Sequence, residues 1–534
     1  MASTSSGPVV APSQLWSAAS TLSLRVQRLR DQFWSFYERE YTNEVRSYAT
    51  GTPWDVVYSI WSWTNVPEVA LFQQGFRSYL WAAATKVELP PGFWQEPLVI
   101  RQALLFREVV CRYLPVQILE GELIVGSHFN TALLRCLKKD EARARDRQER
   151  GFLQAWHELN DVGVGNCGAV PGHLVPNYPK VLKIGWQGIQ AEAQAVASDP
   201  NSTVEQRDLA YAIVICADAV RDLMEGYAAE AQHLADLDTD PPRQSELREI
   251  ARICHKVPWL PPETFPEALQ ALWLTHMLAM AAESYPGPGV SPGRIDQYLI
   301  PYYQSDLESG RLTCEQAREW LQCWWIKHNY VYDYQGWTGT NQGINSSFGQ
   351  LITLGGMDAQ GNDASNDLTY LMLDVIEEMN LLEPKPNVRI HARTSDRLLD
   401  RIVEMLSKAQ GAPFLINFDE NSITGLRWEG LPEDRLWDYA PVGCLENTLA
   451  GDDRSGTVDV NLNFAKAIEL TLNEGGTWQP ASKLARTRVI PEPLPRLSSS
   501  WARSRRNCAI CWNGSFASTI WPMRAAHDGS RCPI

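Results

Sequence analysis

The sequence contains no apolar run long enough to cross a membrane as a helix. The longest such run, residues 268–282, is interrupted by Gln270 and His276, whereas a spanning helix needs about 20 mostly apolar residues. Residues 1–14 are rich in serine, alanine and proline and lack the apolar segment of a signal peptide. We therefore expect a disordered N-terminus over residues 1–14 and a cytoplasmic protein without a membrane partner.

Positive charge is scarce, because 48 lysine and arginine residues stand against 63 aspartate and glutamate residues, a formal net charge of −15. A surface of that sign repels phosphates, which argues against a nucleic-acid partner. The 11 cysteines are scattered along the chain, a pattern typical of a reducing compartment rather than of a disulfide framework. No internal repeat at the periods of solenoid proteins is visible.

The chain has enough apolar sequence for a large core, since 44% of its 534 residues are hydrophobic and 21 are tryptophans. Predicted strands over residues 350–356, 387–391 and 412–417 alternate with predicted helices over 367–379 and 396–408. Such alternation is typical of a parallel α/β arrangement. Further helices are expected over residues 15–45 and 191–237, and a short buried strand or extended segment over 122–126.

One stretch, Pro441 to Asn447, contains a cysteine with a carboxylate two residues later, Cys444 and Glu446. The apolar spacing of residues 458–472 predicts a helix, so we expect the cysteine on a loop that this helix supports. A buried cysteine that acts as a small hydrophobic residue is the ordinary alternative. An ionic nucleophile would need a nearby base such as histidine, and none lies close in sequence. A radical cysteine needs an S–H bond, an adjacent substrate and a carboxylate that moves protons.

The Gly-Cys-Leu-Glu motif and its flanks, residues 439–441 and 461–467, resemble the thiyl loop of the glycyl radical enzymes, the pyruvate formate-lyase-like superfamily. The resemblance implies that Cys444 carries a thiyl radical and that Glu446 is the acid/base. Pyruvate formate-lyase itself has two adjacent cysteines, whereas Gly443 precedes Cys444 here. The implied fold is a ten-stranded α/β barrel wrapped by helices over residues 15–475, incomplete at the C-terminus. Further matches to the family are residues 25–30, 122–126, 172–178, 254–270 and 291–298.

The resemblance also suggests roles for residues outside the loop. The histidine of the Gly-His motif lines the substrate cavity in diol-dehydratase-type members, so His173 is a candidate substrate-binding residue, the alternative being a hydrogen-bonded loop residue. Arg294 and Asp296 are expected to form a buried ion pair with a structural role. Arg389 and His391 are expected to be structural.

The sequence around the cysteine, Cys-Leu-Glu-Asn-Thr, looks most like the arylacetate decarboxylase branch, which acts on 4-hydroxyphenylacetate, phenylacetate or indoleacetate. Residues 285–290 lack the polar pair of the diol and choline members, which favours a flat, apolar substrate. The alternatives are a C–O or C–N lyase and an inactive remnant that only binds a ligand or partner. The resemblance further implies a radical S-adenosylmethionine activating enzyme as partner, a homodimer, and no metal or bound cofactor in this chain.

Residues 476–534 have a different composition, with nine lysine and arginine residues against Glu492 and Asp528 and no regular apolar period. Read one base earlier, the codons for Thr477–Pro480 can encode Asp-Leu-Ala-Thr, which resembles the family. We therefore predict a frameshift near Gly475 and a disordered tail over 476–534. The family's radical glycine, in an Arg-Val-x-Gly-aromatic motif, is absent from the sequence as written, which predicts an inactive chain.

Overall fold

The computed structural model describes residues 22–39, 70–75, 81–114, 116–126, 129–133, 136–144, 147, 163, 165–167, 173–283, 289–329, 349–381, 383–408, 415–443, 445–452 and 460–472. Predictions on residues 1–14, Cys444 and 476–534 fall outside these ranges. None of the described helices is both long and apolar enough to cross a membrane.

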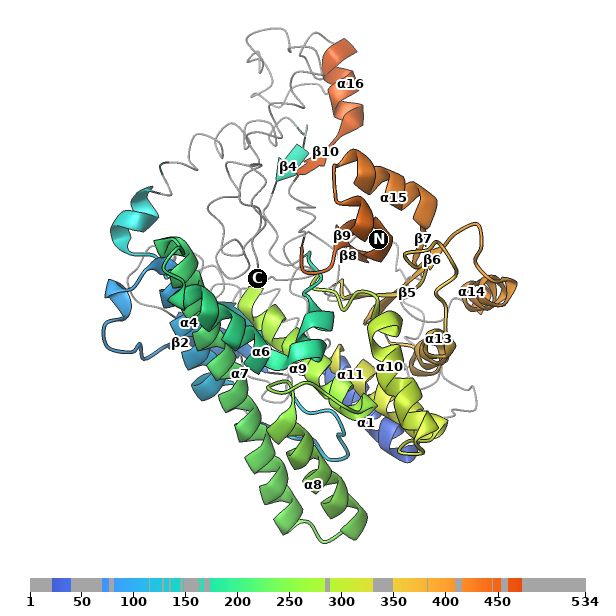
Figure 1. Cartoon of the computed structure of the whole chain (residues 1–534), viewed down its shortest axis with the longest axis horizontal. Coiled ribbons are helices and arrows are strands. Elements are labelled where there is room, and N and C mark those ends of the chain that lie inside the picture. Colours follow the sequence, from blue (N-terminus) through green and yellow to red (C-terminus); the bar gives the residue numbers. More distant parts are fainter. Residues whose placement is uncertain are drawn as a thin grey trace, which may run out of the picture.

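Helices form one half of the molecule (Figure 1). The long helices α7 and α8 pack side by side, with α4 and α6 against α7 and α9 buried among its neighbours. Capping boxes begin two of these helices, Thr203 with Gln206 at α7 and Thr313 with Gln316 at α11. The helices are α1 (Leu24–Arg39), α4 (Leu98–Glu108), α6 (Tyr178–Ser198), α7 (Val204–Leu237), α8 (Pro241–Lys256), α9 (Phe265–Glu283), α10 (Ile295–Glu308) and α11 (Cys314–Lys327).

The other half is built on a parallel sheet in the order β5-β6-β7. Helix α13 (Asp367–Met379) connects β5 to β6, and α14 (Asp396–Lys408) connects β6 to β7. Isolated parallel bridges extend the wall beyond β5, from Gly293 to Ile352 and from Leu174 to Val290. The predicted parallel α/β arrangement is confirmed. The three strands are β5 (Leu351–Gly355), β6 (Lys385–Ile390) and β7 (Leu415–Phe418).

The two faces of this sheet differ in chemistry because side chains alternate along each strand. Ile352, Leu354 and Val388 belong to the main apolar core. The opposite face carries polar residues. In register, Thr353 pairs with Asn387 and Arg389 pairs with Asn417.

Two short antiparallel strands, β8 (Tyr439–Val442) and β9 (Glu446–Leu449), form a hairpin beside this polar face (Figure 1). The N–H of Leu445 donates to the carbonyl of Val442 at 2.9 Å and closes the turn. Gly443 and Leu445 both have positive φ, 53° and 94°. Cys444 belongs to this connection by sequence and lies outside the described residues.

The remaining elements complete the description. They are β1 (Ala70–Gly75), β2 (Trp81–Lys86) and β3 (Phe129–Leu133), which form a sheet in the order β2-β1-β3, together with η4 (Phe93–Gln95), the π-helix η5 (Val109–Tyr113), β4 (Gly165–Cys167), α15 (Asp419–Trp428), η6 (Glu433–Asp438), β10 (Val460–Leu462) and α16 (Phe464–Leu472).

Two boundaries differ from the sequence-based expectation, and one of the two alternatives for residues 122–126 is not formed. The predicted helix over 458–472 is wrong at its start, because β10 pairs with β4 and the Asn463 side chain caps α16 by accepting from the N–H of Lys466 at 3.0 Å. Residues 191–237 form parts of two helices, α6 and α7. Residues 122–126 are buried as expected, and of the two alternatives the strand is not formed, because the Gln270 amide bonds both the N–H and the carbonyl of Val125, at 2.9 and 2.8 Å.

Candidate active site

Two candidate site residues meet at the tip of the hairpin. A Cβ atom at position 443 would lie 2.2 Å from His173 Cδ2, 2.3 Å from His173 Nε2 and 3.0 Å from Glu446 Oε2. The His173 ring therefore lies directly against Gly443, and the Glu446 carboxylate turns back toward the same point. Only glycine fits here without displacing the histidine ring.

The position of His173 is strongly constrained. The side chain is buried, and its backbone has a positive φ of 54°, which is costly for a residue other than glycine. A Cβ at Gly289 would lie 3.1 Å from the ring's Cγ and Nδ1, so two glycines flank the ring. The next residue, Leu174, bridges to Val290 in the wall of the sheet. The histidine is therefore built into the wall beside the hairpin tip.

Glu446 begins β9 and pairs with Val442 across the hairpin. Its side chain is half-buried, so the carboxylate is held near the tip without leaving solvent altogether. Of the three predicted site residues, the structure brings Glu446 and His173 together, while Cys444 lies outside the described residues between two described neighbours, Gly443 and Leu445.

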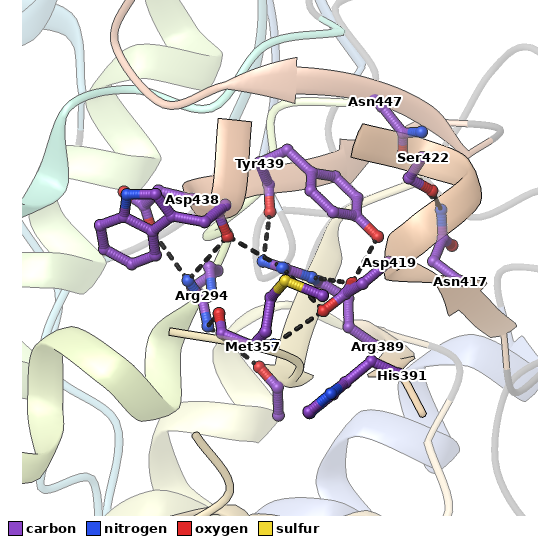
Figure 2. Close-up of polar contacts among 12 residues, drawn as sticks. Arg294, Met357, Arg389, His391, Asn417, Asp419, Ser422, Asp438, Tyr439 and Asn447 are labelled. Atoms are coloured by element: carbon purple, nitrogen blue, oxygen red, sulfur yellow. Dashed lines mark hydrogen bonds and ion pairs between the residues drawn. The ribbon is translucent and has the colours of Figure 1, made fainter. Parts of the chain in front are cut away.

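Buried arginines hold the root of the hairpin (Figure 2). Arg389 and Asp419 are both fully buried and form an ion pair with N–O distances of 2.7 and 3.1 Å. Arg389 also donates to the carbonyls of Tyr439 at 2.9 Å and Trp437 at 2.8 Å. The Tyr439 hydroxyl donates to Asp419 at 2.8 Å, and burial raises the pKa of Tyr439. Arg389 thus has the structural role expected of it.

A second arginine reaches the same root. Arg294 donates to the carbonyl of Trp437 at 3.2 Å and pairs with Asp438 at 3.1 Å. The expected Arg294–Asp296 ion pair is wrong. Asp296 lies in the first turn of α10 and accepts from the N–H of Gly355 at 2.8 Å and from the Thr369 hydroxyl at 2.6 Å. Burial raises the pKa of the Asp296 carboxyl.

A row of asparagine amides, which the sequence analysis missed, links the hairpin to the sheet. Asn387 donates to Asn417 at 2.7 Å, and Asn417 donates to Asn447 on β9 at 3.0 Å. Figure 2 shows Asn417 and Asn447 at one side of the arginine cluster. The available signal was an asparagine inside each of two short predicted strands, Asn387 and Asn417.

A buried histidine network lies behind the tip. Both His276 and His328 bond the side-chain oxygen of Gln350, at 2.8 and 2.6 Å, and Tyr178 bonds the other nitrogen of His276 at 2.6 Å. Burial lowers the pKa of His276 to about 4. The network fixes Gln350, whose neighbour Gly349 contacts the hairpin, since a Cβ there would lie 3.4 Å from Gly443 Cα.

Within the described residues, no group of three or more histidine, cysteine, aspartate or glutamate side chains is arranged to hold a metal ion. The arrangement at the tip instead offers a carboxylate and an imidazole at one point, beside the position of Cys444 in the sequence.

Comparison with known proteins places this chain in a family. The chain is 38% identical over 307 residues to isethionate sulfite-lyase of Oleidesulfovibrio alaskensis, covering 56% of this chain and 37% of that protein. It is 31% identical to (2S)-3-sulfopropanediol dehydratase of Klebsiella oxytoca over 59% of this chain and 38% of the relative. Identity to indoleacetate decarboxylase of Tractidigestivibacter scatoligenes is also 31%, over 59% of this chain and 36% of the relative. The chain thus spans well under half the length of these relatives.

A solved structure of a glycyl radical enzyme from Archaeoglobus fulgidus superposes with a TM-score of 0.64 at 28% identity, covering 80% of this chain and 61% of that one. The profile of the family described as pyruvate formate lyase-like matches residues 145–492. The expected α/β barrel fold is confirmed. The chain therefore belongs to the pyruvate formate lyase-like family and has the fold of the glycyl radical enzymes.

Proposed function

We propose that this chain is the cysteine-bearing part of a glycyl radical lyase, in which Cys444 carries the thiyl radical and Glu446 moves the proton. The observation that carries the proposal is the convergence of the Glu446 carboxylate and the His173 ring on Gly443, the residue before Cys444. A proton-transfer group must lie within hydrogen-bond reach of the reacting substrate. A substrate held at the hairpin tip would meet Cys444, Glu446 and His173 together.

The chemistry of each group follows from this placement. Cys444 would lose its hydrogen atom to a stored radical and, as a thiyl, take a hydrogen atom from a substrate carbon that bears a hydroxyl. Glu446 would accept the hydroxyl proton, so that the bond from the neighbouring carbon to its leaving group breaks and the leaving group departs with the electron pair. The product radical would recover the hydrogen atom from Cys444. His173 would bind the substrate or the leaving group.

The names of the relatives favour loss of sulfite or water, which means cleavage of a C–S or C–O bond. Decarboxylation of an arylacetate is the second candidate, supported by the Cys-Leu-Glu-Asn-Thr sequence and by the likeness to indoleacetate decarboxylase. A C–N lyase and an inactive, ligand-binding remnant are the remaining alternatives. Because the chain spans so little of these relatives, we also propose, rather than take from them, a stored glycyl radical, a radical S-adenosylmethionine activating enzyme and a homodimer.

The test is an anaerobic assay of the gene product with its reading frame restored after Gly475 and with an activating enzyme present. Isethionate, 1,2-propanediol and indoleacetate are the substrates, and sulfite, propanal and skatole are the measured products. Sulfite or propanal supports C–S or C–O cleavage, and skatole alone supports decarboxylation. Full glycyl radical formation with none of these products would contradict all three assignments.

A further inference from the structure

Two fully buried polar side chains lie next to each other on the hairpin face of the sheet. Thr353 on β5 and Asn387 on β6 are partners in the parallel register, so their side chains point to the same face. Arg389, two residues after Asn387, points to that face and contacts the hairpin root, which identifies the face. Both Thr353 and Asn387 have no exposed surface.

Neither side chain has all its hydrogen bonds within the described part of the chain. The Asn387 amide nitrogen donates to Asn417, but its oxygen Oδ1 has no partner, and neither has the hydroxyl oxygen of Thr353. The nitrogen and the oxygen of an asparagine side chain are told apart by the hydrogen bonds that they make. If the whole row were reversed, the nitrogen of Asn387 would be the atom without a partner, so one end of this amide remains unbonded either way.

Buried polar atoms without partners are costly, and such atoms in native proteins are normally bonded to a bound group or to water. The group must be small and neutral, because an ion among neutral partners would lose its hydration without compensation. The group must also be able both to donate and to accept hydrogen bonds. The Thr353 hydroxyl does both, and the atom of the Asn387 amide without a partner is either an acceptor oxygen or a donor nitrogen. An O–H group meets each condition.

We propose that a single O–H group binds between Thr353 and Asn387 and bonds to both. This group extends the row of asparagine amides, so that β5 joins β6, β7 and the hairpin in one hydrogen-bonded chain. Its source is either an ordered water molecule or a hydroxyl of the substrate. The second source rests on the proposed lyase function and would select hydroxylated substrates over arylacetates.

The test is the urea unfolding midpoint of the full chain carrying Thr353→Val, which removes the hydroxyl and preserves the side-chain volume. Valine is a better strand former and more apolar than threonine, so a hydroxyl without a partner predicts equal or greater stability. A hydroxyl that bonds the proposed group predicts a shift of about tenfold toward the unfolded state.

Thr369→Val is the matched control, because the Thr369 hydroxyl is equally buried and donates to Asp296 at 2.6 Å. Its destabilisation shows that the measurement detects the loss of a buried hydroxyl that is bonded within the chain, here to the Asp296 carboxylate and to the N–H of Asn366. If Thr369→Val destabilises the chain while Thr353→Val does not, the proposal is overturned. This comparison needs neither activation nor turnover, so its failure is independent of the proposed function.

The source of the group is distinguished by adding isethionate or ethanesulfonate, which differ only in the hydroxyl. A midpoint raised by isethionate but not by ethanesulfonate, in the unsubstituted chain but not in Thr353→Val, assigns the group to a substrate hydroxyl. No change with either compound, together with destabilisation by Thr353→Val, assigns it to water.

Discussion

Gly443 is the residue on which the geometry of the tip depends most directly. A methyl group there would overlap the His173 ring at 2.2 Å, and the φ of 53° is unfavourable for any other residue. We predict that Gly443→Ala lowers the free energy of unfolding by about 3 kcal/mol, from overpacking and backbone strain together. The measurement is urea denaturation followed by circular dichroism.

Gly425→Ala is the control for this change, because Gly425 lies inside α15 and a Cβ there would meet nothing within 4 Å. It should stabilise the chain by about 0.5–1 kcal/mol, as alanine does in a helix interior. The double substitution Gly443→Ala with His173→Ala should recover part of the loss, since the clash is then removed. A Gly443→Ala chain as stable as the unsubstituted one would mean that the ring does not lie against the hairpin.

His276 predicts a specific loss of stability in acid. Its folded pKa of about 4 lies below the ordinary value of 6.5, so the unfolded chain binds a proton more readily between those values. The contribution of neutral His276 to the free energy of unfolding is therefore complete above pH 6.5. It decreases as the pH falls toward 4, by about 3 kcal/mol in all. Urea midpoints from pH 7 to pH 4.5 should fall less steeply in His276→Gln than in the exposed control His233→Gln. Equal slopes would contradict the prediction.

At the scale of elements, the hairpin is held at three places by unrelated interactions. Two buried arginines hold its root, the amide of Asn417 holds one side, and the His173 ring holds the tip. Glu446 and Asn447 are neighbours on β9, so they point to opposite faces of the hairpin. Glu446, the proposed proton-transfer group, thus faces the proposed substrate position, while Asn447 anchors the strand to the sheet.

This division of roles predicts a local effect when the side anchor is removed. Asn447→Leu should speed amide hydrogen exchange in residues 439–449, because the hairpin loses its bond to β7, while β5 and β6 keep their protection. Exchange measured by mass spectrometry resolves the two regions. The control is Asn421→Leu, an exposed position on α15, which should leave both unchanged. Equal loosening of β5 would show that the amide row stabilises the sheet rather than the hairpin.

The sequence predicted elements well where local periodicity and tertiary structure agree. Helices α13 and α14 have the predicted bounds, because each has a clear apolar face beginning after a polar residue. The start of α16 was misplaced, since pairing of β10 with the distant β4 competes with a helical pattern. The asparagine row and the Arg294–Asp438 pair join residues far apart in sequence, and no single-sequence signal specifies such partners. The Gly-Cys-Leu-Glu motif located the tip because its residues are adjacent.

At the scale of the whole molecule, the reading frame of the last residues determines whether the chain carries the radical glycine that the proposed function needs. The match to the family extends to residue 492, past the predicted frameshift near Gly475. We predict that sequencing of the genomic DNA past the Gly475 codon gives Asp-Leu-Ala-Thr in place of Thr477–Pro480, followed later by an Arg-Val-x-Gly-aromatic motif. Peptides covering residues 496–534 as written, found by mass spectrometry of the native protein, would show instead that the present frame is translated.

With the reading frame restored and the enzyme activated, substitutions of Cys444 and Glu446 should impair turnover in different ways. Cys444→Ser should abolish turnover and leave the glycyl radical signal in electron paramagnetic resonance intact, because a glycyl radical cannot oxidise a hydroxyl. Glu446→Gln should also keep the signal but reduce turnover by about 10²–10⁴-fold, since only proton transfer is lost. Under exchange conditions in D₂O, Glu446→Gln should still pass deuterium from the Cys444 thiol to the substrate, because hydrogen-atom transfer precedes the step that needs the carboxylate. Deuterated substrate recovered from Cys444→Ser would place the hydrogen-atom transfer on another residue.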